Sequence, residues 1–226
     1  MKCVCIFSGG LDSVSSAAYM KNKGYELYLI TFDYGQKARK ELSIAKEFAK
    51  TLGEHKIVDI SFMKDIYGES NVLTSPGKIP SSFDYSIVVP IRNMIFLTIG
   101  GAWAFSIKAS ILAYGAHLDD KNYPDCREEF TKSLEHTFNL AEDDGIRKGL
   151  RREITIWSPV IEGLTKVDMV RIGYKLLGDD IFKTWSCYDN NEIHCGVCES
   201  CNNRKNAFRL ADINDKTEYA LNIERR

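Results

Sequence analysis

The stretch FSGGLDS, residues 7–13, connects a buried strand predicted over residues 3–7 to a helix predicted over residues 11–23. Its two glycines let the backbone approach an anion closely, and the start of the helix directs unpaired N–H groups and the positive end of a dipole toward that anion. Ser8 and Ser13 add hydroxyl donors. Asp12 is itself an anion, and a carboxylate beside a phosphate site is best explained as a partner of Mg²⁺. The stretch therefore predicts a phosphate site, against the alternative of a plain junction in which Asp12 and Ser13 only cap the helix.

The chain continues as an alternation of short apolar runs and amphipathic stretches. Strands are predicted over residues 27–32, 56–60, 110–114 and 154–157, and helices over residues 38–52, 93–105 and after Pro124. A further helix begins near Lys166, where Thr165 is placed to cap it and Asp168 occupies the capping-box position. This rhythm predicts an α/β fold with a mostly parallel, doubly wound sheet. Ligands of such sheets bind beyond the carboxyl ends of the strands.

Two segments interrupt this rhythm. Residues 62–90 contain Gly, Ser and Pro with little periodicity and are too long for an ordinary connection, so we expect a flap over the active site. After residue 177 the alternation gives way to a run of cysteines. We therefore expect a main domain over residues 1–180 and a small C-terminal segment over residues 181–226.

The composition indicates a globular protein without a strong overall charge. Of the 226 residues, 44% are hydrophobic and 27% charged, and 30 Lys and Arg against 31 Asp and Glu leave a net charge of −1. This balance creates no general attraction for nucleic acid or for a membrane surface. No charged leader precedes the first strand, and no window approaches the roughly 20 apolar residues of a membrane span. We expect a cytoplasmic protein that binds neither nucleic acid nor membrane.

Four of the seven cysteines fall within fifteen positions near the end of the chain: Cys187, Cys195, Cys198 and Cys201. In a reducing compartment such spacing favours metal binding over disulfides, and four thiolates match a closed tetrahedral zinc site with a structural role. The alternative is that these cysteines bind an iron–sulfur cluster. The early Cys187 and the absence of a Cys-Pro run disfavour that cluster. A zinc-dependent nucleic-acid-binding module would need a basic surface around the cysteines, whereas acidic residues lie there.

The SGGLDS string resembles the phosphate loop of the N-type ATP pyrophosphatases, which cleave ATP to AMP and pyrophosphate. Further strings resemble one member of that class, the 7-cyano-7-deazaguanine synthase (QueC) family, in the same order along nearly the whole chain. They are FDYGQ at residues 32–36, VPIRN at 89–93, GAH at 115–117, DD at 119–120, YPDCREEF at 123–130, LTK at 164–166 and TWSCY at 184–188. Two positions depart from that family: Ile91 replaces a small residue and Ala38 replaces a histidine.

The resemblance implies an ATP-dependent ligase that converts 7-carboxy-7-deazaguanine and ammonia to a nitrile. Adenylation activates the acid, ammonia forms the amide, and a second adenylation permits elimination to 7-cyano-7-deazaguanine. The same adenylation chemistry also serves tRNA thiolation and deazaguanine-type protein modification, which are the alternative activities. By resemblance, the nucleotide contacts are Phe7, Ser8, Gly9, Gly10, Leu11, Asp12, Ser13, Val14, Ser15, Ser16 and Ala17.

Several other polar residues are candidates for the chemistry. Catalytic roles are expected for Asp12, for Arg92, where a helix begins, and for Lys166, whose charge opposes the helix dipole unless pyrophosphate lies nearby. Asp33 ends a strand and could approach ribose or metal. Substrate contacts are expected from Arg92, Asn93, Asp125 and Arg127, because a carboxylate such as that of Asp125 can accept from a guanine-like edge. We also expect a homodimer, since small metal-binding appendages often support subunit contacts.

Overall fold

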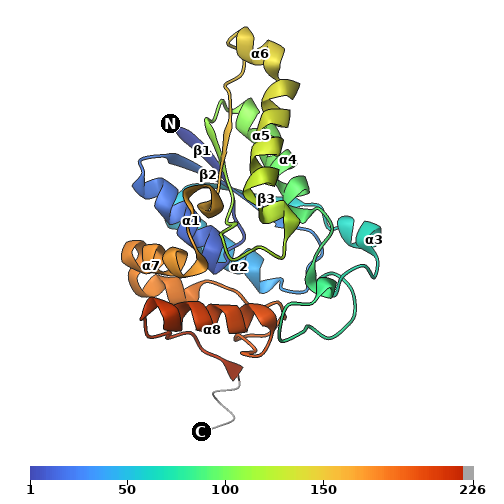
Figure 1. Cartoon of the computed structure of the whole chain (residues 1–226), viewed down its shortest axis with the longest axis vertical. Helices are drawn as coiled ribbons and strands as arrows, with labels where there is room; N and C mark the ends of the chain where they lie inside the picture. Colours follow the sequence, from blue (N-terminus) through green and yellow to red (C-terminus); the bar gives the residue numbers. More distant parts are fainter. Residues whose placement is uncertain (221–226) are drawn as a thin grey trace.

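A five-stranded parallel sheet forms the centre of the molecule (Figure 1). The computed structural model describes residues 1–220, so the end of the predicted segment 181–226 lies outside the described residues. The strands are β1 (Lys2–Ile6), β2 (Glu26–Asp33), β3 (Glu54–Asp59), β4 (Ile111–Ala113) and β5 (Thr155–Trp157). Their order is β3-β2-β1-β4-β5, and all four pairings are parallel. The order reverses between β1 and β4, which confirms the doubly wound α/β fold.

The helices follow the strands in the predicted alternation. They are α1 (Leu11–Asn22), α2 (Lys40–Leu52), α3 (Met63–Tyr67), α4 (Arg92–Ser106), α5 (Glu128–Ala141), α6 (Asp143–Arg147), α7 (Lys166–Leu177) and α8 (Glu199–Ala211). Four 3₁₀ turns lie at Tyr85–Ile87, Pro124–Cys126, Pro159–Glu162 and Gly178–Lys183. Helices α3, α6 and α8 were not predicted. The helix expected after Pro124 begins only at Glu128, because residues 124–126 form a 3₁₀ turn first.

Alternate side chains of β1 point to opposite faces of the sheet and fill two separate cores. Cys3 and Cys5 pack with α1 and α2, whereas Val4 packs with α4 and α5. This period of two is a direct consequence of the pleated strand. On the first face the helices contribute Val14, Ala17, Met20, Ala45, Phe48, Ala49 and Leu52; on the second they contribute Leu97, Ala104, Phe105 and Leu134.

Helices α7 and α8 form a further layer against α1. Helix α7 begins with the predicted capping box, in which Thr165 Oγ1 accepts from the backbone N–H of Asp168 and the Asp168 carboxylate accepts from that of Thr165. Helix α8 packs on α7, and its Phe208 shares a small core with Leu11 at the start of α1. Figure 1 shows α8 crossing beneath the sheet, close to both the phosphate-loop end and the segment after α3.

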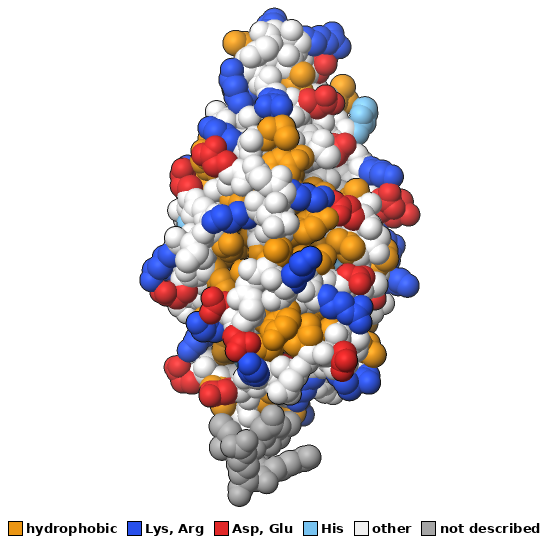
Figure 2. All heavy atoms as spheres, turned by 90° about the vertical axis from the view of Figure 1, so that its left-hand side faces the viewer, with side chains coloured by type: hydrophobic (Ala, Val, Ile, Leu, Met, Phe, Trp, Pro, Cys, Tyr) orange, Lys and Arg blue, Asp and Glu red, His pale blue; other side chains and the backbone are white. Residues whose placement is uncertain are grey.

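One helical stretch, Tyr85–Ser106, is long and apolar enough to cross a membrane by length and composition, with a mean hydropathy of 1.5. The expectation that no window reaches this level is therefore wrong. A core helix passes the same test, and α4 packs against β1 and β4 with Leu97 and Ala104 fully buried. On the face seen in Figure 2, Lys and Arg alternate with Asp and Glu around small apolar areas, as the near-zero net charge suggests.

The contact between α1 and α7 depends on the absence of a side chain at Gly173. A Cβ there would lie 2.3 Å from Ser15 Oγ and 2.9 Å from Ile181 Cδ1. Gly173→Ala should therefore destabilise the fold by about 1–3 kcal/mol, because overpacking outweighs the better helix propensity of alanine. Urea unfolding measures this change. Ser15→Ala alone should be nearly neutral, since the buried hydroxyl has no partner among the described residues, and it should restore part of the stability lost in Gly173→Ala. Equal stability of Gly173→Ala and the wild type would contradict the packing argument.

Candidate functional site

A cavity of about 720 Å³ opens beyond the carboxyl ends of β1 and β4. This is the position at which the strand order reverses, where ligands of doubly wound sheets bind. Ser8 follows β1 and Gly115 follows β4, and both line the cavity. The segment that was expected to form a flap contributes Leu73, Ser81, Ser82 and Phe83 to the wall.

The phosphate loop forms one end of this cavity. Ser8 Oγ accepts from the backbone N–H of Gly10 at 3.2 Å, and Ser13 Oγ donates to the Gly10 carbonyl at 3.0 Å. Gly9 has a φ of +79°, and a Cβ there would lie 2.6 Å from the backbone nitrogen of Ala45 in α2. Only glycine satisfies both constraints. The loop is thus held in a curled shape with its N–H groups at the start of α1.

The predicted nucleotide contacts divide into two groups. Five of the residues, Ser8, Gly10, Leu11, Asp12 and Ser13, line the cavity. Phe7, Gly9, Val14, Ser15, Ser16 and Ala17 are instead buried and do not belong to the cavity wall. Asp33 accepts from the backbone N–H of Gly35 at 3.2 Å and pairs with Arg39, and it is not among the described residues of the cavity wall.

Asp12 lies in a charged cluster at the phosphate-loop end. Its Oδ2 accepts from Lys166 Nζ at 2.7 Å, and its Oδ1 lies 3.6 Å from His117 Nε2. Burial acts to raise the pKa of Asp12, but Lys166 and His117 outweigh it and lower that pKa below its usual value. Asp12 therefore stays ionised. Its Oδ1 is buried and has no hydrogen-bond partner among residues 1–220.

Two further carboxylates complete this cluster, and the sequence did not assign roles to them. Asp119 accepts from the backbone N–H of Lys166 at 2.8 Å, and Asp120 Oδ2 lies 3.3 Å from His117 Nδ1. Burial raises the pKa of Asp120, with Asp12 adding to the effect and His117 opposing it. The available signal was the acidic pair in the loop that follows the β4 strand. Carboxylate oxygens of this kind, together with the unpartnered Oδ1 of Asp12, fit a divalent cation.

Arg92 lies in the cavity wall away from Asp12, at the start of α4. Its Nη1 donates to the Tyr34 hydroxyl at 3.3 Å, and the guanidinium carbon lies 5.9 Å from the centre of the Tyr34 ring. The preceding residue, Ile91, has a φ of 45°, which a β-branched side chain adopts only with strain. This turn directs Arg92 into the cavity.

The other predicted substrate contacts lie in different surroundings. Asn93 lines the cavity, and its backbone N–H donates to Asp125 Oδ2 at 3.0 Å. Asp125 therefore caps the start of α4. Arg127 is exposed and donates to the Lys121 carbonyl at 3.1 Å. Neither Asp125 nor Arg127 belongs to the described cavity wall.

Glu41 lines the cavity and was missed by sequence reasoning, because a glutamate in the first turn of α2 reads as an ordinary helix start. Burial raises its pKa to about 7, against the opposing influence of Arg92. A carboxyl that titrates near neutral pH can accept and return a proton during a reaction.

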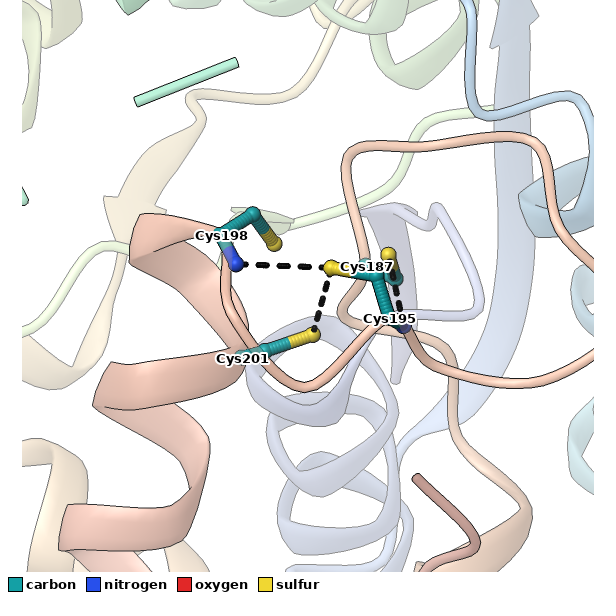
Figure 3. Close-up of side chains that lie close together, drawn as sticks. All are labelled: Cys187, Cys195, Cys198 and Cys201. Atoms are coloured by element: carbon teal, nitrogen blue, oxygen red, sulfur yellow. Dashed lines mark hydrogen bonds between the residues drawn. The ribbon is translucent and has the colours of Figure 1, made fainter. Parts of the chain in front are cut away.

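The four predicted metal ligands converge. The sulfur atoms of Cys187, Cys195, Cys198 and Cys201 all lie within 4.8 Å of one another (Figure 3). Backbone N–H groups donate to them: Cys195 N to Cys187 Sγ at 3.4 Å, and Cys198 N to Cys195 Sγ at 3.3 Å. Such bonds stabilise thiolates and orient them toward one point. The geometry fits a tetrahedral metal ion.

Comparison with known proteins assigns the chain to a family. The model of the family described as "Queuosine biosynthesis protein QueC" matches residues 2–212. The chain belongs to the QueC family. Relatives named "7-cyano-7-deazaguanine synthase" include a protein from Caldicellulosiruptor saccharolyticus that is 40% identical, covering 99% of this chain and 98% of the relative. Others come from Thermoplasma acidophilum, 39% identical over 96% of this chain and 92% of the relative, and Pseudoalteromonas translucida, 38% identical over 96% and 98%.

The match to the QueC family spans the phosphate loop, the charged cluster, Arg92 and all four cysteines. It therefore includes every part of the cavity described above. The two departures from the QueC pattern also lie at this cavity: Ala38 is buried in its wall, and Ile91 adjoins Arg92. The left-handed backbone at residue 91 gives a physical reason for preferring a small residue there.

The raised pKa of Glu41 predicts a pH-dependent stability of the ligand-free protein. The proton is bound more tightly in the folded state, so this stabilisation is complete below pH 4.5 and is lost as pH rises to about 7. Glu41→Gln cannot ionise, so between pH 4.5 and 8 its free energy of unfolding relative to wild type should rise, by up to about 3 kcal/mol. Urea unfolding at both pH values measures the difference. Glu47→Gln, on the exposed side of α2, is the control and should show no such change. A constant difference for Glu41→Gln would mean that the carboxyl is not perturbed.

Proposed function

We propose that this chain is an ATP-dependent ligase that converts 7-carboxy-7-deazaguanine and ammonia to 7-cyano-7-deazaguanine. Each of two ATP molecules is cleaved to AMP and pyrophosphate, through an adenylated acid and then an adenylated amide. The observation that carries this proposal is the cavity that contains the phosphate loop, Lys166 and Arg92. Its volume of about 720 Å³ lies in the usual range for ligand sites. The names of the relatives support the same substrate.

The residues of the phosphate-loop end position the nucleotide. The N–H groups at the start of α1 and the Lys166 ammonium bind the pyrophosphate portion, and Ser8 and Ser13 hold the loop in shape. Asp12 keeps Lys166 protonated: burial acts to lower the pKa of Lys166, but Asp12 and Asp120 raise it. Lys166 therefore presents a full positive charge where negative charge accumulates on the leaving pyrophosphate.

The reaction consists of two adenylations with ammonia addition between them. A substrate carboxylate oxygen attacks the α-phosphorus, and the bond to pyrophosphate breaks. Ammonia then displaces AMP to form the amide, with loss of one proton. The amide oxygen attacks a second ATP in the same way, and departure of AMP with the remaining N–H protons leaves the nitrile. Arg92 binds the carboxylate, and Asn93 binds the substrate beside it. Asp125 supports Asn93 from outside the wall.

A divalent cation fits the carboxylates around Asp12, and we assign Mg²⁺ to this position. Asp12 Oδ1 is buried without a partner in the described part of the chain, and Asp119 and Asp120 lie beside it. When bound, Mg²⁺ neutralises phosphate charge and orients the oxygens around phosphorus.

Four cysteine thiolates leave no open position for water, so we assign Zn²⁺ to this site with a structural role. We also propose that residues 1–180 form the main domain with the phosphate loop, and that residues 181–226 form a zinc-binding segment whose Trp185, Ser186 and Glu199 complete the cavity wall. We further propose a cytoplasmic homodimer, in which the metal-binding segment supports the subunit contact. The near-zero net charge supports the proposal that it binds neither nucleic acid nor membrane. Sulfur transfer is disfavoured, because burial raises the pKa of Cys126, with Asp120 and Asp125 adding to the effect, and keeps its thiol protonated.

Incubation with 7-carboxy-7-deazaguanine, ammonia, Mg²⁺ and ATP tests the function directly. Mass spectrometry should show the amide first and the nitrile only when more than one ATP per acid is supplied. Asp12→Ala should lower turnover by at least about 10², since a preorganised charge-stabilising group is lost. Asp144→Ala, on the exposed tip at α6, is the matched control. ADP and phosphate as products, or an untouched acid beside a modified tRNA or peptide, would refute the proposed reaction.

Purified protein should contain about one zinc per chain and should be colourless. Cys198→Ser should lose the metal and unfold at lower urea concentration, because metal-binding free energy contributes to folding. Cys126→Ser changes a cysteine outside the cluster and should retain the zinc. Elemental analysis and absorbance spectra provide the measurement. If the protein contains iron and sulfide, or absorbs strongly in the visible range, the site holds an iron–sulfur cluster and the zinc assignment is wrong.

A further inference from the structure

Arg204 is a fully buried arginine without a carboxylate partner in the described part of the chain. It lies on α8, one turn after the metal ligand Cys201. A buried guanidinium usually needs a paired anion, because removing its charge from water is costly. Here it donates only to neutral oxygens. Any negative charge that compensates Arg204 therefore lies beyond hydrogen-bond distance.

The hydrogen bonds of Arg204 join residues 181–186 to Thr217. Its Nη1 donates to Thr184 Oγ1 at 2.8 Å and to Ser186 Oγ at 3.0 Å. Its Nη2 donates to the Ile181 carbonyl at 3.3 Å, and to Thr217 Oγ1 at 2.9 Å. We call residues 184–187 the strap. Because Arg204 binds two of the four strap side chains, it fixes the conformation of this segment.

The strap connects the phosphate loop to the metal cluster. The backbone N–H of Trp185 donates to the Gly9 carbonyl at 3.0 Å, and a Cβ on Gly10 would lie 3.3 Å from the Trp185 carbonyl oxygen. Trp185 and Ser186 also line the cavity. The next residue, Cys187, is a predicted metal ligand. Two more come from the start of α8, where Cys198 is the N-cap and Cys201 lies in the first turn. One rigid segment therefore contacts both sites.

Arg204 also interacts electrostatically with both sites. Burial lowers the pKa of Arg204, while Tyr219, Asp215 and Asp12 act to raise it. A divalent ion in four thiolates carries a net charge of about −2, and a nucleotide polyphosphate adds more negative charge at the other end of the strap. Binding at either site therefore supplies an anion for this unpaired cation.

We propose that Arg204 is a positioning residue that couples metal binding at the four cysteines to nucleotide binding at the phosphate loop. The nucleotide part rests on the proposed function. Coupling between two sites is reciprocal, so metal should tighten nucleotide binding by the same factor by which nucleotide tightens metal binding. We expect a factor of at least about 5, the lower end for coupled sites.

The test measures both sides of the coupling by equilibrium binding. Titration calorimetry compares the Kd of an ATP analogue with a methylene group between the α- and β-phosphates for zinc-loaded and chelator-stripped protein. Competition with a chromophoric chelator gives the zinc Kd with and without the analogue. In wild type both ratios should be equal and at least about 5. In Arg204→Gln both should fall toward 1. A purely structural role for Arg204 would weaken both ligands but leave their coupling unchanged.

Milder variants keep the test decisive if Arg204→Gln does not fold. Thr184→Val removes one acceptor of Arg204 and should reduce the coupling factor, whereas Arg209→Gln, on the exposed side of α8, should leave it unchanged. Equal nucleotide affinity in loaded and stripped wild type, or full coupling in the Arg204 and Thr184 variants, would overturn the proposal. Full coupling in those two variants is also the result expected if zinc affects nucleotide binding only by stabilising the whole fold.

Inorganic pyrophosphate separates this inference from the proposed function. If pyrophosphate binds with metal-dependent affinity but the ATP analogue does not bind, the nucleotide assignment is wrong and the role of Arg204 stands. If the analogue binds and no nitrile forms, the substrate assignment is wrong and the coupling can still be measured. If neither ligand binds the loaded protein, both proposals fail.

Discussion

The close approach of Gly9 to α2 is the constraint on which the site depends. With a φ of +79° and a Cβ position only 2.6 Å from the Ala45 nitrogen, the loop cannot accept a side chain and keep its curl. The curl directs the N–H groups at the start of α1 into the cavity. It also leaves the Gly9 carbonyl free to accept from Trp185, so that the C-terminal segment is attached to the same loop. The anion site and the metal-binding segment thus share one glycine.

Charge balance around Asp12 follows from this arrangement. Gly115 approaches the start of α1 so closely that a Cβ would lie 3.1 Å from the Ser13 nitrogen. The chain after β4 therefore lies against the phosphate loop, and His117 and Asp120 come close to Asp12. Lys166 enters from α7, whose start is held by the capping box and by Asp119. Lys166, with a smaller effect from His117, outweighs burial and keeps Asp12 ionised. Three segments, the phosphate loop with α1, the chain after β4, and α7, therefore bring these charged groups together.

The C-terminal segment contributes to the site as well as to the metal cluster. Residues of α8 line the cavity, and the backbone N–H of Glu199 donates to the Pro80 carbonyl at 2.9 Å, which holds the segment over residues 62–90 against α8. Trp185 and Ser186 form another part of the wall. The wall of the cavity is therefore built from both sides of residue 180. This arrangement gives the metal cluster a physical connection to the chemistry that a separate appendage would lack.

Local sequence determined the strands, the five helices α1, α2, α4, α5 and α7, and the two strongest motifs. Alternating apolar runs are sufficient to predict α/β structure, and FSGGLDS places glycines where a phosphate loop requires them. Four cysteines that are close in the sequence also lie close in space, so their spacing predicts a metal site. Local sequence did not show that α4 is a core helix, because the hydropathy of Tyr85–Ser106 also satisfies the criterion for a membrane span. A helix buried on a sheet is as apolar as one in lipid, and only its packing on β1 and β4 distinguishes the two.

Tertiary structure alone decided which polar side chains reach the cavity. Asp125 and Arg127 stand beside a motif in sequence, but the short 3₁₀ turn at Pro124–Cys126 directs one to cap α4 and leaves the other exposed. Glu41 looks like an ordinary helix-start glutamate, yet it lines the cavity, where burial raises its pKa to about 7. In the sequence, Arg204 looks like a surface arginine of an amphipathic helix, but in the fold the strap covers and buries it. Burial and charge partners depend on residues far apart in the chain, so no local pattern contains them.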